Sequence, residues 1–393
     1  MNHKMIYLDN AATTAVRPEV LEAMLPWFTE HYGNPSSIHT AGREAKVAVE
    51  TARKQVAAAI GAQPQEIYFT GCGSESDNWA IRGLADVAKG KHIITSAVEH
   101  HAVLHPCEYL EKKGYEVTYL PVDEFGRVSP QAVKDAIRED TILITIMTAN
   151  NEIGTIEPIA EIGAIAKAAG VPFHTDAVQA IGAIPVDVKA MNVDMLSMSA
   201  HKFNGPKGVG ALYIRKGLRI SPFMLGGAQE HNKRAGTENL ASIVGMGKAI
   251  ELAVSQMEEH KKVLVRLRDK LIAGVTNTIP DVRLNGHPTD RLPNNFNMCF
   301  RFIEGESLLM RLDLACIEGS SGSACTSGSL DPSHVLLAIG LPHEIAHGSL
   351  RLTLGHDTTE ADIDYVLEKL PGIVQVLRDM SPLYYLEKEK ENA

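Results

Sequence analysis

The stretch SAHKFNGPKGVG, residues 199–210, places Lys202 between a predicted strand and a turn rich in glycine and proline. An amine in this position would lie at the edge of a sheet where the ligands of α/β folds bind. Most lysines are solvated surface charges, and that interpretation stays open for Lys202 taken alone. A functional amine is the alternative, and it depends on other reactive groups that converge on the same edge.

A carboxylate, Asp176 in HTDAVQA, closes the strongly apolar run that begins at Val171. Burying a carboxylate is costly unless it meets a cation or a good hydrogen-bond donor. Two interpretations stay open. Asp176 caps the turn after the strand, or it binds the protonated nitrogen of a pyridine ring.

The stretch FTGCGSESDNWAI, residues 69–81, predicts a strand, a turn with glycines and the start of a helix. Gly71 and Gly73 allow close backbone approach, Ser74 offers a hydroxyl, and a helix N-terminus offers N–H groups with a favourable dipole. Together these features suit a phosphate. The alternative is an ordinary capped helix, with Ser74 and Asp77 in its first turn.

Three further motifs stand at predicted strand ends, and each can also be a plain turn or cap: VEHHAVL with His100, ANNEIGT with Asn151, and KRAGTEN with Thr237. Combined with the lysine, the acid and the anion site, they indicate pyridoxal phosphate. This cofactor needs an amine for its aldehyde, an acid for its ring nitrogen, a phosphate cradle and a ring that stacks on it.

A thiol stands in unusual surroundings, because Cys325 lies in SSGSACTSGS, a loop of small residues without a large apolar side chain. Such a thiol is expected to be exposed and able to react. The cysteines are odd in number, spread widely and form no CxxC pair, which opposes both a disulfide framework and a structural zinc site. They are Cys72, Cys107, Cys299, Cys316 and Cys325. We expect no intrinsic metal.

The elements that must position these groups alternate between β-rich runs and helical patterns from residue 66 to 215. Several runs are continuously apolar, as expected for strands covered on both faces. They predict an α/β fold with a mainly parallel sheet of about seven strands, at 66–70, 92–97, 116–122, 141–148, 171–177, 194–200 and 210–215. A long helical stretch at 238–275 then leads to a smaller α+β domain.

Length and charge limit the function further. The 393 residues favour two domains, and the net charge of −10 comes from interspersed acids, which argues against nucleic acid as a partner. No signal peptide and no apolar run of membrane-spanning length are recognisable, so we expect a cytoplasmic protein that binds no membrane.

The motifs YLDNAATT, GNPSSIH, ANNEIGT, HTDAVQ, SAHKFNGPKGVG, RAGTEN and SSGSACTS follow one another in the order known from one family. The chain resembles the cysteine desulfurases of the class-V aminotransferase superfamily, and its nitrogen-fixation (NifS) branch somewhat more than its housekeeping branch. The resemblance implies a fold-type-I transferase fold. It also implies a large cofactor-binding domain at 16–257 and a small domain made of 1–15 and 258–393, which carries the cysteine loop.

The resemblance implies a role for each motif residue. Lys202 would carry pyridoxal phosphate, Asp176 would pair with its ring nitrogen, and Gln179 would contact its ring hydroxyl. His100, rather than its neighbour His101, would stack on the ring. The phosphate would be held by Gly73, Ser74, Ser199, His201 and Thr237, with Thr237 reaching across from the second subunit of a homodimer. Asn151 and Arg351 would bind the substrate carboxylate.

The implied reaction removes sulfur from L-cysteine, releases L-alanine and leaves a persulfide on Cys325, which passes to an iron–sulfur scaffold protein, with nitrogenase maturation as one destination. Lys202 and His100 would move the protons. A related aminotransferase or selenocysteine lyase and a catalytically silent assembly partner are the rivals.

No cation stands beside Cys325, and the nearest candidate, His334, is nine positions away. The chain reads TGCGSES where relatives usually have a threonine- and serine-rich run. Cys72 is expected to be a packing residue, with a second reactive thiol as the alternative.

Overall fold

The computed structural model describes residues 5–321 and 332–391. Its main feature is a seven-stranded sheet in the order β2-β8-β7-β6-β5-β3-β4. All neighbouring strands are parallel except β8, which is antiparallel to both β2 and β7. The strands are β2 (Ile67–Thr70), β3 (His92–Ser96), β4 (Glu116–Leu120), β5 (Thr141–Thr145), β6 (Phe173–Asp176), β7 (Met195–Ser199) and β8 (Gly210–Ile214). Each lies within a predicted run, so the predicted mainly parallel sheet is confirmed.

Helices cover both faces of this sheet. Successive strand residues point to opposite faces, and Ile93 and Ile94 accordingly pack into two different apolar clusters. One cluster includes residues of α4 (Gly73–Ala85) and α5 (His101–Glu111); the other includes residues of α3 (Thr40–Ala59), α7 (Ile159–Ala169) and α9 (Leu240–Ser255). The helix α7 ends at Gly170, whose φ of 68° gives the left-handed cap expected of a glycine.

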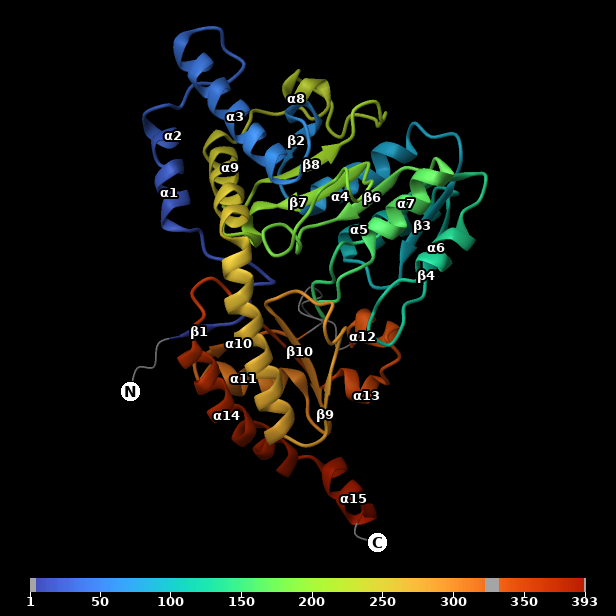
Figure 1. The fold of residues 1–393 in the computed structure, drawn as a ribbon, viewed down its shortest axis with the longest axis vertical. Helices are drawn as coiled ribbons and strands as arrows, with labels where there is room; N and C mark the ends of the chain where they lie inside the picture. Colours follow the sequence, from blue (N-terminus) through green and yellow to red (C-terminus); the bar gives the residue numbers. More distant parts are fainter. Residues whose placement is uncertain (1–4, 322–331, 392–393) are drawn as a thin grey trace.

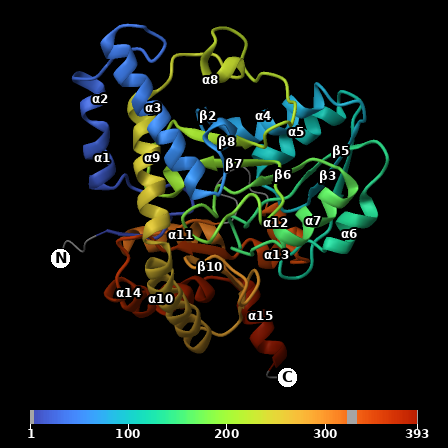
Figure 2. The same ribbon diagram turned by 45° about the horizontal axis from the view of Figure 1, so that its top comes forward.

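A second region lies below the sheet in Figure 1. The predicted helix at 238–275 is divided at Gln256 into α9 and α10 (Met257–Thr278), which lead from the sheet into this region (Figure 2). A small antiparallel sheet in the order β12-β10-β9 packs here with α10 and α14. The strands of this sheet are β9 (Val282–Leu284), β10 (Asn295–Phe300) and β12 (Ser349–Thr353). The second region also contains the helices α11 (Gly305–Leu314) and α14 (Glu360–Asp379).

The N-terminal segment belongs to this second region. The strand β1 (Ile6–Tyr7) pairs in parallel with β11 (Ile317–Glu318), and Ile6 and Leu8 join the apolar cluster of the second region. After Asp9, which bridges to Thr353, the chain crosses to the edge of the large sheet. The separate apolar clusters support the division into 16–257 and 1–15 with 258–393, which stays a prediction.

The remaining elements are short helices and the C-terminal helix. They are α1 (Pro18–Met24), α2 (Pro26–Thr29), η1 (Pro64–Glu66), α6 (Pro130–Ala136), η2 (Ala200–Lys202), α8 (Gln229–Asn232), α12 (His334–Ala338), α13 (His343–Ala346) and α15 (Pro382–Glu391). Within residues 5–321 and 332–391, no helix is long and apolar enough to cross a membrane.

Candidate active site

A cavity of about 290 Å³ lies at the carboxyl ends of β6 and β7. Parallel strands bring the residues that follow them to one edge, so residues far apart in the sequence meet here. Every predicted site residue within the described ranges except Thr237 lines this cavity: Gly73, Ser74, His100, Asn151, Asp176, Gln179, Ser199, His201, Lys202 and Arg351. Thr237 does not line the cavity of its own chain, and Cys325 lies outside the described residues.

Lys202 reaches the cavity from η2, directly after β7. Its Nζ donates hydrogen bonds to the carbonyl oxygens of Ala11 (2.6 Å) and Ala12 (2.8 Å). Gln179 Nε2 donates to the same Ala11 oxygen at 2.9 Å. These two carbonyl groups belong to the N-terminal motif YLDNAATT, whose sequence indicates the family resemblance but not this contact. Because a backbone carbonyl leaves no mark in residue type, no local signal identifies it.

Asp176, the last residue of β6, is only 7% exposed. Its Oδ1 accepts a hydrogen bond from the Val178 N–H at 2.8 Å, so the capping interpretation is correct. The same carboxyl group also lines the cavity. Burial raises its pKa to about 6, against the opposing effect of the Lys202 charge. A buried carboxylate of this kind fits a cationic ring nitrogen, because the attraction between the two charges would offset the cost of burying the carboxylate.

A second buried acid, Asp77, also lines the cavity. The capped-helix alternative places Asp77 in the first turn of α4. It is 1% exposed, and within the described residues its Oδ1 has no hydrogen-bond partner. Burial and the nearby Asp176 raise its pKa. His174 Nε2 is 3.6 Å from Oδ1, yet burial lowers the His174 pKa to about 3, so the ring is neutral and supplies no countercharge.

The candidate anion site lies where α4 begins. The N-cap residue of α4 is Cys72, whose side chain forms no capping hydrogen bond with the helix. The simple capped-helix alternative is therefore wrong. First-turn N–H groups at such a terminus attract anions. A Cβ on Gly73 would come within 2.7 Å of Val178 Cγ2, which explains the glycine. Ser199 Oγ is buried and has no hydrogen-bond partner among the described residues, as expected of a hydroxyl that binds a ligand oxygen.

His100 is the N-cap of α5, and its Nδ1 accepts a hydrogen bond from the Ala102 N–H at 3.1 Å. An accepting Nδ1 carries no proton, so the ring hydrogen is on Nε2. Burial, with a smaller effect from Lys202, lowers the His100 pKa to about 4, and the ring is therefore neutral. His101 does not line the cavity and instead packs against His105 and His334, with ring centroids 4.9 and 4.8 Å away.

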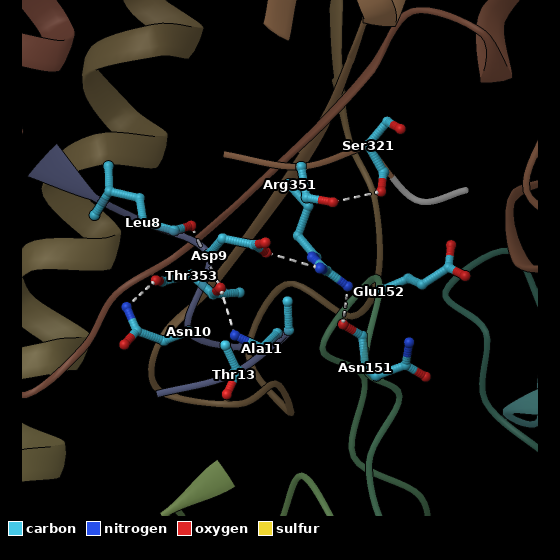
Figure 3. A network of polar contacts seen from close by, with 12 residues as sticks. Leu8, Asp9, Asn10, Ala11, Thr13, Asn151, Glu152, Ser321, Arg351 and Thr353 are labelled. Carbon is cyan, nitrogen blue, oxygen red and sulfur yellow. Dashed lines mark hydrogen bonds and ion pairs between the residues drawn. The ribbon is translucent and has the colours of Figure 1, made fainter. Parts of the chain in front are cut away.

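Arg351 comes from β12 of the second region and is 3% exposed. Its Nη1 donates to the Asn151 carbonyl oxygen (3.1 Å), and its Nη2 donates to Asp9 Oδ1 (2.9 Å). Figure 3 shows the guanidinium group between these two segments. Its Nε is buried and has no partner among the described residues. A planar guanidinium with unused N–H groups suits a two-pronged contact with a carboxylate.

The thiols differ sharply in accessibility. The expectation that Cys72 packs in the interior is wrong, because Cys72 is exposed and lines the cavity. Cys107 and Cys299 are buried, and burial raises the pKa of both. His334, the candidate cation for Cys325, forms a hydrogen bond through Nε2 with the Glu99 carbonyl oxygen (2.9 Å). Burial lowers the His334 pKa, so this ring is a poor source of positive charge.

A further buried acid, Glu157, lies six residues after Asn151. Glu157 is 4% exposed, its Oε2 accepts a hydrogen bond from the Val128 N–H at 2.8 Å, and burial raises its pKa to about 8. Since the folded state then binds a proton more tightly than the unfolded chain, the stability contributed by this proton is present below about pH 4.5 and is lost as the pH rises through about 8.

The variant Glu157→Gln is therefore expected to lose this dependence. As the pH rises from 5 to 8, the melting temperature of the variant should increase by several degrees relative to that of wild type, as measured by calorimetry. The exposed Glu124→Gln makes the same charge change and serves as control. A difference between Glu157→Gln and wild type that does not vary with pH would contradict the raised pKa.

Taken together, these groups fit pyridoxal phosphate. The cavity holds an amine, a buried acid, a neutral histidine ring and an anion cradle with an unpartnered hydroxyl, all on different elements. Each matches one chemical group of that cofactor. Within residues 5–321 and 332–391, no group of three histidine, cysteine or acidic side chains is placed to hold a metal ion.

Comparison with known proteins gives consistent results. The family model for aminotransferase class-V matches residues 6–366. A cysteine desulfurase IscS of Methanosarcina thermophila is 62% identical over 383 residues, which cover 97% of this chain and 95% of that protein. A cysteine desulfurase IscS of Clostridium botulinum is 59% identical over 396 residues, 99% of this chain and 100% of that protein. A solved NifS-like protein superposes with a TM-score of 0.90 at 41% identity, over 95% of this chain and 100% of that chain.

Proposed function

Because the chain belongs to the aminotransferase class-V family, and within it to the cysteine desulfurases, which use pyridoxal phosphate, we propose that the cavity around Lys202 removes sulfur from L-cysteine. One observation carries this proposal: the Lys202 amine, the Asp176 carboxyl group and the Arg351 guanidinium line a single cavity. Family membership favours this reaction over the aminotransferase and silent-partner alternatives.

The cofactor would be held by residues at three sides of the cavity. Lys202 would bind it covalently, and Asp176 would pair with its ring nitrogen. The α4 N-terminus at Gly73 and Ser74, together with Ser199 and His201, would hold the phosphate, while His100 would cover the ring and Gln179 would contact its hydroxyl. When bound, pyridoxal phosphate withdraws electrons from the carbon atoms of an attached amino acid.

The substrate would be oriented by its carboxylate, which Arg351 and Asn151 would bind. Arg351 reaches the cavity from β12 and Lys202 from η2, and the Cα of L-cysteine would lie between their side chains. Lys202 Nζ would remove the Cα proton of the bound substrate. The neutral His100 ring, with its hydrogen on Nε2, is able to return a proton to the product.

The sulfur would leave by nucleophilic attack of the Cys325 thiolate on the substrate sulfur. The new S–S bond forms, the substrate C–S bond breaks, and the electron pair of that bond stays on the carbon, which takes up a proton to become L-alanine. L-Cysteine and one thiol thus become L-alanine and one persulfide, with no added oxidant or reductant. Cys325 lies outside the described residues, and its role rests on the family resemblance and its loop composition.

The assembly and the acceptor extend this proposal. The proposal includes a homodimer, in which Thr237, which does not line the cavity of its own chain, would complete the phosphate site of the second subunit, as the family resemblance implies. An iron–sulfur scaffold protein would accept the persulfide sulfur. A part in nitrogenase maturation and a cytoplasmic location stay predictions.

The test follows the products of one turnover. Purified holoenzyme is mixed with L-cysteine in the absence of reducing thiols, and L-alanine, sulfide and the persulfide on Cys325 are measured together. We expect L-alanine and Cys325 persulfide in equal amounts before any sulfide is released. L-Alanine formed without a persulfide on Cys325 would contradict the mechanism.

A further inference from the structure

The carboxylate of Asp9 contacts the proposed substrate-binding arginine directly. Arg351 Nη2 donates to Asp9 Oδ1 at 2.9 Å, and the two residues form an ion pair with Arg351 3% and Asp9 21% exposed at the side chain. In Figure 3 the guanidinium group points at Asp9 from one side and at Asn151 from the other. Asp9 belongs to the motif YLDNAATT, and the family resemblance implies no role for it.

A guanidinium group has five N–H bonds to distribute. In Arg351 one goes to the Asn151 carbonyl oxygen and one to Asp9, while Nε has no partner among the described residues. The other nearby acid, Glu152, is engaged elsewhere, since its Oε2 accepts a hydrogen bond from Ser333 Oγ. Asp9 is thus the acid hydrogen-bonded to Arg351, and two acceptors on separate segments fix the plane of the guanidinium.

Asp9 is itself held firmly. Its backbone bridges to Thr353, two residues from Arg351 on the same strand, and its carbonyl oxygen accepts hydrogen bonds from the Ala12 and Thr13 N–H groups. Two and three residues further on, Ala11 and Ala12 bind the Lys202 amine. One short turn, residues 9–12, therefore contacts both the guanidinium and the amine between which the substrate would lie.

We propose that Asp9 is a positioning residue for recognition of the substrate carboxylate. It fixes the Arg351 guanidinium so that the unused N–H groups of Arg351 meet the carboxylate as a pair, and it compensates a buried positive charge before substrate arrives. This inference rests on the proposed function, in which Arg351 binds the carboxylate. Without Asp9 the guanidinium keeps a single anchor, the Asn151 carbonyl, and its plane is free to turn.

The test compares two amines that differ only in the carboxylate, L-alanine and ethylamine. Their binding to the holoenzyme is measured by the change in cofactor absorbance. In Asp9→Ala we expect the dissociation constant of L-alanine to rise about tenfold and that of ethylamine to change less than about twofold, because only L-alanine uses Arg351. The KM for L-cysteine should rise to a similar extent with little change in kcat.

Asp9→Asn keeps an oxygen acceptor without the charge, so we expect about a threefold loss for L-alanine and none for ethylamine. If Asp9→Ala does not fold, Asp9→Asn tests the role of Asp9 by the same comparison of L-alanine with ethylamine. Asp290→Ala, which removes the partner of Arg127 in an exposed ion pair, should leave both constants unchanged. Equal losses for the two amines in the Asp9 variants, or no loss for either, would overturn the role of Asp9.

Arg351→Gln separates this inference from the proposed function. If Arg351→Gln abolishes the preference for L-alanine while the Asp9 variants retain it, Arg351 binds the carboxylate and the inference about Asp9 alone is wrong. If Arg351→Gln keeps the wild-type preference, the proposed carboxylate site is wrong and the inference about Asp9 fails with it. Loss of the preference for L-alanine in Arg351→Gln and in the Asp9 variants supports both the proposed carboxylate site and the role of Asp9.

Discussion

The Lys202→Ala variant is expected to lose at least about 10³-fold in turnover of L-cysteine and to lose the visible absorbance of covalently held cofactor. Lys202 is the one lysine among the described residues that line the cavity, so no other side-chain amine there can replace it. The variant loses the covalent link and the base for the Cα proton together. Stopped assays for L-alanine and an absorption spectrum of the purified protein measure both effects.

The matched control is Lys207→Ala, five positions further along the same turn, where the side chain is exposed and does not line the cavity. It should keep the absorbance and the turnover of wild type. Since Lys202 also donates to Ala11 and Ala12, a melting curve must show that Lys202→Ala is folded. Normal colour together with normal turnover in folded Lys202→Ala would show that the amine is not the cofactor anchor.

The Cys325→Ser variant is expected to form no persulfide and to lose roughly 10²–10³-fold or more in L-alanine formation, with the cofactor absorbance intact. A serine hydroxyl is a far weaker nucleophile than a thiolate. Binding of L-alanine should be unchanged, because the carboxylate and the cofactor keep their partners. Mass spectrometry after reaction with L-cysteine locates the persulfide.

Two further cysteine variants complete this experiment. Cys72→Ser removes the exposed thiol that lines the cavity and should still form the persulfide on Cys325. Cys316→Ser changes a half-buried thiol outside the cavity and should behave like wild type. Wild-type turnover in Cys325→Ser, or a persulfide that is found on Cys72, would refute the assignment of the nucleophile.

The positions of the strands followed from local patterns in the sequence. All seven strands of the large sheet lie within predicted runs, because a continuous apolar run between turn signals favours a strand that is covered on both faces. The residues after those strands then had to meet at one edge, which is why Asp176 and Lys202 were identified as site residues. The sequence predicts one helical stretch at 238–275. The interruption at Gln256 could not be predicted, because no glycine or proline stands there.

Other features depended on contacts between distant segments. Asp9 and Arg351 are 342 positions apart and meet because β1 joins the C-terminal region before the chain crosses to the large sheet. The expectation that Cys72 packs in the interior is wrong, and nothing in the sequence indicated that Asp77 is buried, since a residue near a helix start can face either the interior or solvent. Residue type and spacing specify local conformation and the chemistry that is available. Burial, charge compensation and the partner of each side chain arise only when the two regions pack together, because these properties belong to the space that several segments enclose.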